Sequence, residues 1–283
     1  MAKFIAACVQ TSTSDDMARN LREVGELVRQ ARDKGAEFIT TPEVVALMDR
    51  GRSMREQAVA EEQHPARAAF SELAAETGSW LLAGSIAVSA EDGRMANRSL
   101  LFDPRGQVVQ RYDKIHMFDV NLEGNESYRE SRSYRPGERA ALARLPWGVL
   151  GMTVCYDLRF PYLYRALAQA GADFLTIPSA FARPTGRAHW EVLMRARAIE
   201  TGCFVIAAAQ CGVHAHERKT YGHSIIVAPW GEVMVQAGEE VGVITAEIDT
   251  DLIAKARHQV PSLQHDREFS GPEPLPESAA AAE

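Results

Sequence analysis

Residues 149–161 read Val-Leu-Gly-Met-Thr-Val-Cys-Tyr-Asp-Leu-Arg-Phe-Pro, and this stretch carries the strongest information about the fold. Its apolar run, 149–154, has the length and composition of a buried strand. The polar residues that follow mark the end of that strand, and α/β proteins place their ligands and reactive groups at strand ends. We therefore expect an α/β fold in which the thiol of Cys155 lies at the end of a buried strand.

Two other predicted strands end in an isolated charged residue. Residues 38–43 read Phe-Ile-Thr-Thr-Pro-Glu and end at Glu43, and residues 108–114 read Val-Val-Gln-Arg-Tyr-Asp-Lys and end at Lys114. A carboxylate, an ammonium and a thiol are complementary groups for covalent catalysis. We therefore treat Glu43, Lys114 and Cys155 as one candidate site.

The N-terminal half alternates apolar runs with amphipathic segments, which is the pattern of a sheet covered by helices. Spacings of three and four between apolar residues predict one helix from Asp15 or Asp16 to Lys34. A second helix is expected to have Pro65 in its first turn and to stop at Gly78. The expected strands of this half are 3–10, 36–41, 80–88, 97–103 and 107–113.

The C-terminal half repeats this plan. Its expected strands are 148–155, 173–178, 203–211, 222–228 and 232–236, and its expected helices are 161–170 and 188–201. Residues 97–109 and 222–234 both read as strand, Pro-X-Gly turn, strand. The alternative is that two common hairpins coincide by accident.

Two related βα halves predict two sheets packed face to face with the helices outside, a four-layer αββα sandwich. We expect residues 1–270 to form a single domain. Residues 271–283 are a low-complexity end that we expect to be mobile.

The bulk properties exclude several classes of protein. The chain has 283 residues and a formal net charge of -7, and no Lys or Arg cluster supplies the basic face that nucleic acid binding needs. Its longest strongly apolar stretch, 203–209, is far shorter than the roughly 20 residues of a membrane span. The apolar part of residues 1–10 is too short for a signal peptide. We expect a cytoplasmic protein.

The four cysteines are expected to be free thiols. Cys8, Cys203 and Cys211 lie in or beside apolar strands and suit buried packing positions. Cys211 with His214 and His216 resembles a metal cluster, but no fourth ligand follows at a zinc-like spacing. We expect no metal and no cofactor.

The chemistry of the candidate site follows from how a thiol becomes a nucleophile. A cysteine attacks a carbonyl carbon only as its proton leaves, so it needs a base or a nearby positive charge. Glu43 can accept that proton, and Lys114 can stabilise the oxyanion together with the backbone N–H of Tyr156. This set suits hydrolysis of a carbon–nitrogen bond. Taken singly, the three side chains could equally be a structural cysteine and two solvated charges.

With their flanking residues, these positions resemble the nitrilase, or carbon–nitrogen hydrolase, superfamily. The matching contexts are Pro-Glu at 42–43, Tyr-Asp-Lys-Ile-His at 112–116 and Cys-Tyr-Asp-Leu-Arg-Phe-Pro at 155–161, within a resemblance from residue 4 to about 269. It implies that Glu43 is the general base, that Lys114 stabilises the oxyanion and that Cys155 forms a thioester, without metal or organic cofactor. It also implies a homodimer or a larger homo-oligomer.

The same family places a second glutamate between the lysine and the cysteine. Glu130 fits the motif position. Glu123, Glu126 and Glu138 lie in the same polar segment and remain alternatives.

Longer strings at 167–173, 178–181, 188–201, 207–212 and 221–224 resemble the amidase branches of the family. They imply a small anionic amide as substrate, first of all deaminated glutathione, which would give 2-oxoglutarate and cysteinylglycine. The alternatives are 2-oxoglutaramate or a related omega-amide, and then an N-carbamoyl amino acid. From another class, a catalytically inactive scaffold or binding protein also stays open.

A substrate with two carboxylates needs cations in its pocket. Arg159 and Arg183 are the candidates, with Phe181 beside them, although Arg159 could instead brace Asp157. Two stretches depart from the family pattern, namely Asp113 before the lysine and the acidic run 119–126. Both bear on the identity of the substrate more than on the type of reaction.

Overall fold

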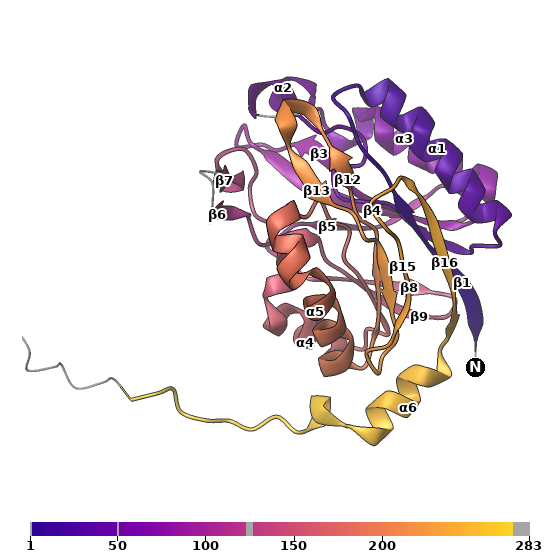
Figure 1. Cartoon of the computed structure of the whole chain (residues 1–283), viewed down its shortest axis with the longest axis vertical. Coiled ribbons are helices and arrows are strands. Elements are labelled where there is room, and N and C mark those ends of the chain that lie inside the picture. Colours follow the sequence, from indigo (N-terminus) through magenta and orange to yellow (C-terminus); the bar gives the residue numbers. More distant parts are fainter. Residues whose placement is uncertain (1, 50, 123–126, 274–283) are drawn as a thin grey trace, which may run out of the picture.

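The structure is a computed structural model that describes residues 2–49, 51–122 and 127–273. In this part of the chain, two six-stranded sheets lie face to face with helices on their outer faces (Figure 1). The helices are α1 (Met17–Asp33), α2 (Gly51–Gln57), α3 (Pro65–Thr77), α4 (Pro161–Gln169), α5 (Arg183–Thr201) and α6 (Asp251–Gln259). The predicted αββα sandwich is confirmed.

The first sheet has the order β16-β1-β2-β3-β4-β5. Strands β1, β2 and β3 are parallel, and β4, β5 and β16 add antiparallel pairs on the two sides. The strands are β1 (Lys3–Gln10), β2 (Phe38–Thr40), β3 (Trp80–Ser89), β4 (Met95–Phe102), β5 (Val108–Asp113) and β16 (Gly242–Asp249).

The second sheet, in the order β15-β14-β11-β10-β9-β8, repeats this arrangement. Its parallel strands β9, β10 and β11 are followed by the antiparallel pair β14–β15, as β1, β2 and β3 are followed by β4–β5. The repeated Pro-X-Gly hairpins are therefore equivalent elements of two related halves. The strands are β8 (Ala141–Leu145), β9 (Gly148–Met152), β10 (Phe174–Thr176), β11 (Phe204–Ala207), β14 (Ile225–Val227) and β15 (Val233–Gln236).

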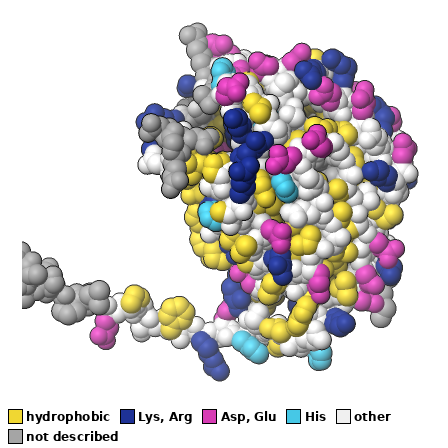
Figure 2. Space-filling view, viewed as in Figure 1, with side chains coloured by type: hydrophobic (Ala, Val, Ile, Leu, Met, Phe, Trp, Pro, Cys, Tyr) yellow, Lys and Arg dark blue, Asp and Glu magenta, His cyan; other side chains and the backbone are white. Residues whose placement is uncertain are grey.

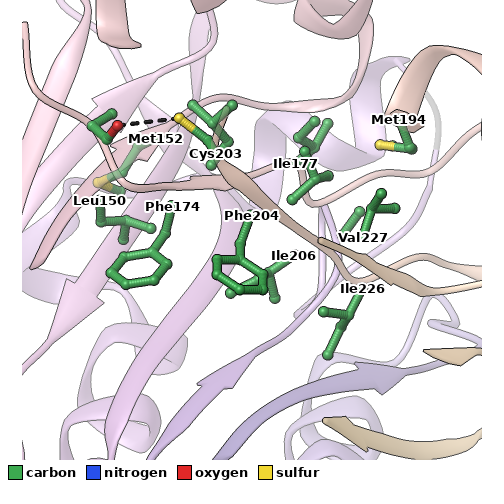
Figure 3. Packing of buried hydrophobic residues seen from close by; sticks show 14 of the residues in the cluster. Leu150, Met152, Phe174, Ile177, Met194, Cys203, Phe204, Ile206, Ile226 and Val227 are labelled. Carbon is green, nitrogen blue, oxygen red and sulfur yellow. Dashed lines mark hydrogen bonds between the residues drawn. The ribbon is translucent and has the colours of Figure 1, made fainter. Parts of the chain in front are cut away.

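The main core lies between the two sheets. Because successive side chains of a strand point to opposite faces, Phe4, Ala6 and Cys8 of β1 pack towards the second sheet, whereas Ala7 and Val9 pack under α1 and α3. Figure 3 shows the second sheet's share of this core. There the rings of Phe174 and Phe204 lie side by side, with centroids 6.2 Å apart.

Several predicted boundaries are wrong. The strand expected over 148–155 ends at Met152, because a tight 3-10 turn begins at Cys155. The strand expected over 203–211 is two strands, β11 and β12 (Cys211–Val213), and 222–228 contributes only the three residues of β14. Strand β12 forms a separate hairpin with β13 (Lys219–Tyr221). Helix α5 begins at Arg183, five residues before the expected 188, because Pro184 is well suited to a first helical turn.

The part of the chain after the sandwich extends away from it. Asp266 still contacts Arg165 and Gln169 of α4, and residues 267–273 are exposed and run away from the body (Figure 1). The rest of the expected tail, 274–283, lies outside the described residues. Among the described helices, none is long and apolar enough to cross a membrane.

Gly84 of β3 lies against the segment after β2 and against Pro178, which follows β10 of the second sheet. A Cβ atom at this position would lie 2.0 Å from the carbonyl oxygen of Thr41 and 2.6 Å from Cβ of Pro178. We therefore expect Gly84→Ala to lower the free energy of unfolding by about 3 kcal/mol, since an overpacked core must shift its backbone.

Gly242→Ala is the matched control for this substitution. Gly242 is also a strand glycine, but an added Cβ would meet nothing within 4 Å. Urea unfolding should show a change within about 0.5 kcal/mol for Gly242→Ala. Equal stabilities of the two variants would contradict the close approach at Gly84.

Candidate active site

Five segments from both sheets converge on one cavity. Glu43 follows β2, Asn97 lies in β4, Lys114 follows β5, Cys155 follows β9 and Ala180 follows β10. All five line a cavity of about 990 Å³. The parallel strands of each sheet end on the same side, so their carboxyl ends bring distant sequence segments together.

Lys114 is the buried centre of the charged groups. Its side chain is 2% exposed, and its Nζ lies 2.9 Å from Oε1 of Glu43 and 2.8 Å from Oε2 of Glu130. Burial disfavours the ammonium, but the charges of Glu130 and Glu43 outweigh it and hold the pKa of Lys114 well above its ordinary value. Burial likewise opposes ionisation of Glu43, and Lys114 more than offsets this, so the pKa of Glu43 is lowered. Both groups are therefore charged.

Neutral donors fix the two carboxylates. The backbone N–H of Ala180 donates to Oε2 of Glu43 at 2.8 Å, and that of Phe118 donates to Oε2 of Glu130 at 2.7 Å. The side-chain amide of Asn97 donates to both glutamates, at 2.9 Å and 3.2 Å. Each carboxylate is thus held in one orientation around the lysine.

Cys155 sits in a strained turn. Its φ is 50°, a left-handed value that costs a residue with a Cβ about 1 kcal/mol or more. Its backbone N–H donates to the carbonyl of Pro178 at 3.0 Å, which anchors the turn to the segment after β10. Such strain is characteristic of functional positions.

The thiol of Cys155 is protonated at rest, and Glu43 is one of the groups that keep it so. Burial raises its pKa, and the negative charge of Glu43 raises it further, whereas Lys114 and a hydrogen bond from the Ala180 backbone act in the opposite direction. The balance places the pKa well above the ordinary value of 9.0. An ionised carboxylate near a protonated thiol is an arrangement in which the carboxylate can accept the thiol's proton.

The structure brings Glu130 into the site and leaves Glu138 out of it. Glu130 contacts Lys114 directly, whereas Glu138 lines a separate groove beside Arg135 and Arg139. The other two alternatives, Glu123 and Glu126, lie outside the described residues.

The predicted substrate-binding residues fall into two groups. Phe181 and Arg183 line the cavity, as does Tyr156. Arg159 is not among the lining residues, because its guanidinium packs on the rings of Tyr156 and Phe181 and approaches His189 at 3.3 Å. It does not brace Asp157 either, since that carboxylate is bound by other groups.

Sequence reasoning missed Asn97 and Arg218. Asn97 lies inside an expected strand, where an amide gives no sign of a polar partner on another segment. Arg218 belongs to a stretch that resembles a polar loop, yet its guanidinium donates to the carbonyl of Ala180 at 3.3 Å and lies over the ring of Tyr128. Its charge is also close enough to help lower the pKa of Glu43.

The outer part of the cavity is cationic. Figure 2 shows Lys and Arg side chains gathered near the β12–β13 hairpin and the start of α5. Among the described lining residues, six cationic side chains face four acidic ones. The cationic residues are Lys114, Arg129, Arg183, Arg187, Arg218 and Lys219, and the acidic residues are Glu43, Asp49, Glu130 and Glu217.

Arg183 has spare donor capacity. Its Nε is buried without a hydrogen-bond partner in the described structure, and its Nη2 is 3.9 Å from Glu239. The cavity therefore combines the thiol of Cys155 with several cationic side chains.

His214, one of the three residues that resemble a metal cluster in the sequence, links two loops instead. His214 is buried, with Nδ1 2.8 Å from the carbonyl of Thr13 and Nε2 2.6 Å from Oγ1 of Thr220. Burial lowers the pKa of His214 to about 4, so the ring is a neutral link between two loops. Across the described residues, no group of three or more His, Cys, Asp or Glu is placed to hold a metal ion.

The family model of carbon-nitrogen hydrolases matches residues 5–258 of this chain. The chain belongs to the carbon–nitrogen hydrolase family. A protein of Yersinia enterocolitica named deaminated glutathione amidase is 40% identical to it, over 92% of each chain.

Solved structures support the same assignment. The NitFhit protein of C. elegans has a TM-score of 0.88 at 33% identity, covering 94% of this chain and 66% of that longer one. A mutant of an amidase from Nesterenkonia sp. AN1 has a TM-score of 0.75 at 25% identity, covering 91% of this chain and 98% of that one. In that structure, acrylamide has added to the active site cysteine of the amidase.

The charge state of Glu43 predicts the pH profile of this enzyme. If Glu43 is the proton acceptor, it must be ionised, and its pKa lies below the ordinary 4.5. We therefore expect kcat/KM to stay constant from about pH 8 to about pH 5 and to fall only below that. Initial rates across this range test it, with circular dichroism at each pH to verify the fold. An acid limb centred between about pH 6 and 7 would show that Glu43 is not the ionised base.

Proposed function

We propose that the chain is a cysteine-dependent amidase that hydrolyses the carbon–nitrogen bond of a small anionic amide through a thioester. One observation carries this proposal. The ionised carboxylate of Glu43 contacts the ammonium of Lys114 and lies close enough to the thiol of Cys155 to raise its pKa, so base, nucleophile and positive charge meet around one group.

Acylation begins when Sγ of Cys155 attacks the amide carbon while its proton passes to Glu43. The carbonyl oxygen becomes an anion, which Lys114 and the N–H of Tyr156 stabilise. The intermediate then collapses: the C–N bond breaks, and Glu43 returns the proton to the leaving nitrogen. The products of this half-reaction are a free amine and a thioester of Cys155.

Deacylation uses the same groups with water as the nucleophile. Glu43 accepts a proton from water as the oxygen attacks the thioester carbon, and Lys114 again stabilises the oxyanion. Collapse releases the acid, and the proton on Glu43 restores the thiol. One water is consumed for each amide: the amine carries the proton that left the thiol, and the water supplies the hydroxyl of the acid and the proton that restores the thiol.

Glu130 keeps Lys114 in position for this work. Both of its oxygens lie within 3.0 Å of Nζ, so a single N–H can serve them jointly. A second N–H of the Lys114 ammonium is directed to Glu43, so the third N–H is available for the developing oxyanion.

Among the candidate substrates, we place deaminated glutathione first. It is an elongated amide with a 2-oxoacid at one end and a glycine carboxylate at the other, and Arg183 and Arg218 provide guanidinium groups at the mouth. The relative in Yersinia enterocolitica bears the corresponding name. The products would be 2-oxoglutarate and cysteinylglycine, and 2-oxoglutaramate is the alternative substrate.

The proposal is tested by measuring 2-oxoglutarate release from both substrates with wild-type and Cys155→Ala protein. Wild type should favour deaminated glutathione in kcat/KM by about tenfold or more, which corresponds to roughly 1.4 kcal/mol of transition-state binding. Cys155→Ala should abolish release while it keeps the wild-type melting temperature. Release by a folded Cys155→Ala variant would overturn the cysteine mechanism, and inactivity of wild type towards both compounds would overturn the substrate assignment.

The substitution Arg218→Gln tests the cationic mouth. It should raise KM for deaminated glutathione by about tenfold, because one charge-assisted hydrogen bond to a carboxylate is lost. An analogue with the glycine carboxylate converted to an amide should show the same KM with both proteins. An equal rise in KM for the two substrates would instead mean that Arg218 shapes the pocket without binding a carboxylate.

The homodimer implied by the family resemblance stays a prediction, as does the cytoplasmic location. The outer face of α5 offers one surface for a subunit contact, since Val192 and Ile199 are 68% and 55% exposed and Trp230 beside them is 52% exposed. Analytical ultracentrifugation of the purified chain measures the oligomer directly.

A further inference from the structure

Asp157 is a fully buried carboxylate that accepts four hydrogen bonds. Its side chain is 0% exposed. Its Oδ2 accepts from the hydroxyl of Tyr112 at 2.6 Å and from the backbone N–H of Val154 at 2.8 Å. Its Oδ1 accepts from the backbone N–H of His116 at 3.1 Å and lies 2.7 Å from Nδ1 of the same residue.

The four contacts of Asp157 come from the two segments that carry Lys114 and Cys155. Tyr112 and His116 flank Lys114 at two residues on each side. Val154 and Asp157 flank Cys155 in the strained turn. One carboxylate thus ties the segment that carries the ammonium to the segment that carries the thiol.

We propose that Asp157 is a positioning residue, which sets the distance between Nζ of Lys114 and Sγ of Cys155 by tying the end of β5 to the turn after β9. This inference rests on the cysteine mechanism proposed above and deepens it. The oxyanion forms between these two atoms, so an error of about 1 Å in their separation can reduce the rate by about a hundredfold.

Asp157 acts as an acceptor on both of its oxygens. Each oxygen accepts a backbone N–H, and Oδ2 also accepts from the hydroxyl of Tyr112, which keeps its proton because burial together with the charge of Asp157 raises the pKa of Tyr112. A carboxylate has no proton to offer, so Nδ1 of His116 carries the hydrogen, and Nε2 can accept from the hydroxyl of Tyr162 at 2.5 Å. The imidazole also stacks on Phe160, with centroids 3.5 Å apart.

Tyr112→Phe and Tyr164→Phe make a matched pair of variants. Tyr112 and Tyr164 are both buried, and each donates or shares one hydroxyl hydrogen bond in the same core. The partner of Tyr164 is Oγ1 of Thr153, at 2.8 Å, which does not reach the lysine segment. Both variants lose a buried hydrogen bond, but only Tyr112→Phe loosens the tie to Lys114.

With deaminated glutathione as substrate, Tyr112→Phe should lower kcat by about tenfold and change KM by less than about twofold. Tyr164→Phe should leave kcat within about twofold of the wild-type value. Its melting temperature should fall by about as much as that of Tyr112→Phe. If both variants lower the melting temperature and neither changes kcat, Asp157 is only structural and the proposal is wrong.

Substitutions of His116 provide a second test that does not touch the buried tyrosines. His116→Ala removes the side-chain donor to Asp157, whereas His116→Asn can place an amide N–H near the former position of Nδ1. We expect His116→Asn to recover at least about fivefold of the kcat lost in His116→Ala. Equal kcat values for the two variants would also overturn the proposal.

The failure of this proposal can be told from failure of the proposed function. Cys155→Ala and wild type are assayed in the same series. If Cys155→Ala keeps activity, the cysteine mechanism itself is wrong. If Cys155→Ala is inactive while Tyr112→Phe matches wild type in kcat, only the role of Asp157 is wrong.

Discussion

The buried ammonium of Lys114 is the constraint on which the site depends. A lone charge in a protein interior costs several kcal/mol, so it persists only where opposite charges and hydrogen bonds surround it. Here Glu43 and Glu130 supply the charges, and Asn97 and backbone N–H groups hold the glutamates. Because Glu43 follows a strand of the first sheet and Ala180 follows one of the second, these bonds also fix how the two sheets meet.

Periodicity and the repeated hairpin were enough to predict the sandwich, because they report which faces of each segment must be buried. Elements whose position depends on partners distant in the sequence were not predicted. Strand β16 pairs with β1 across more than two hundred residues, and nothing within 242–249 signals that partner. Strand β9 ends early for a similar reason, since the turn at Cys155 is set by its hydrogen bond to Pro178.

The residues of the candidate site could be predicted where they follow a strand. A single charged residue or thiol directly after an apolar run is a clear signal in the sequence. Glu43, Lys114 and Cys155 were found in this way, and the family motif added Glu130. Asn97 was not predicted, because its role is to donate hydrogen bonds to two glutamates that lie on other segments. Arg159 shows the limit of sequence proximity: its cation is near Cys155 in sequence, but it lies over aromatic rings and is not among the residues that line the cavity.

The resting charges also explain how a buried thiol can be both reactive and protected. A protonated thiol is a poor target for oxidants, since thiolate character governs that reaction. In the proposed mechanism, removal of its proton by Glu43 becomes favourable only when a carbonyl oxygen beside Lys114 takes up the negative charge. The mechanism thus couples nucleophilicity to the presence of a substrate, and this coupling requires that thiol, carboxylate and ammonium keep fixed distances. A rigid tie between the segments that carry them, as at Asp157, follows from the same requirement.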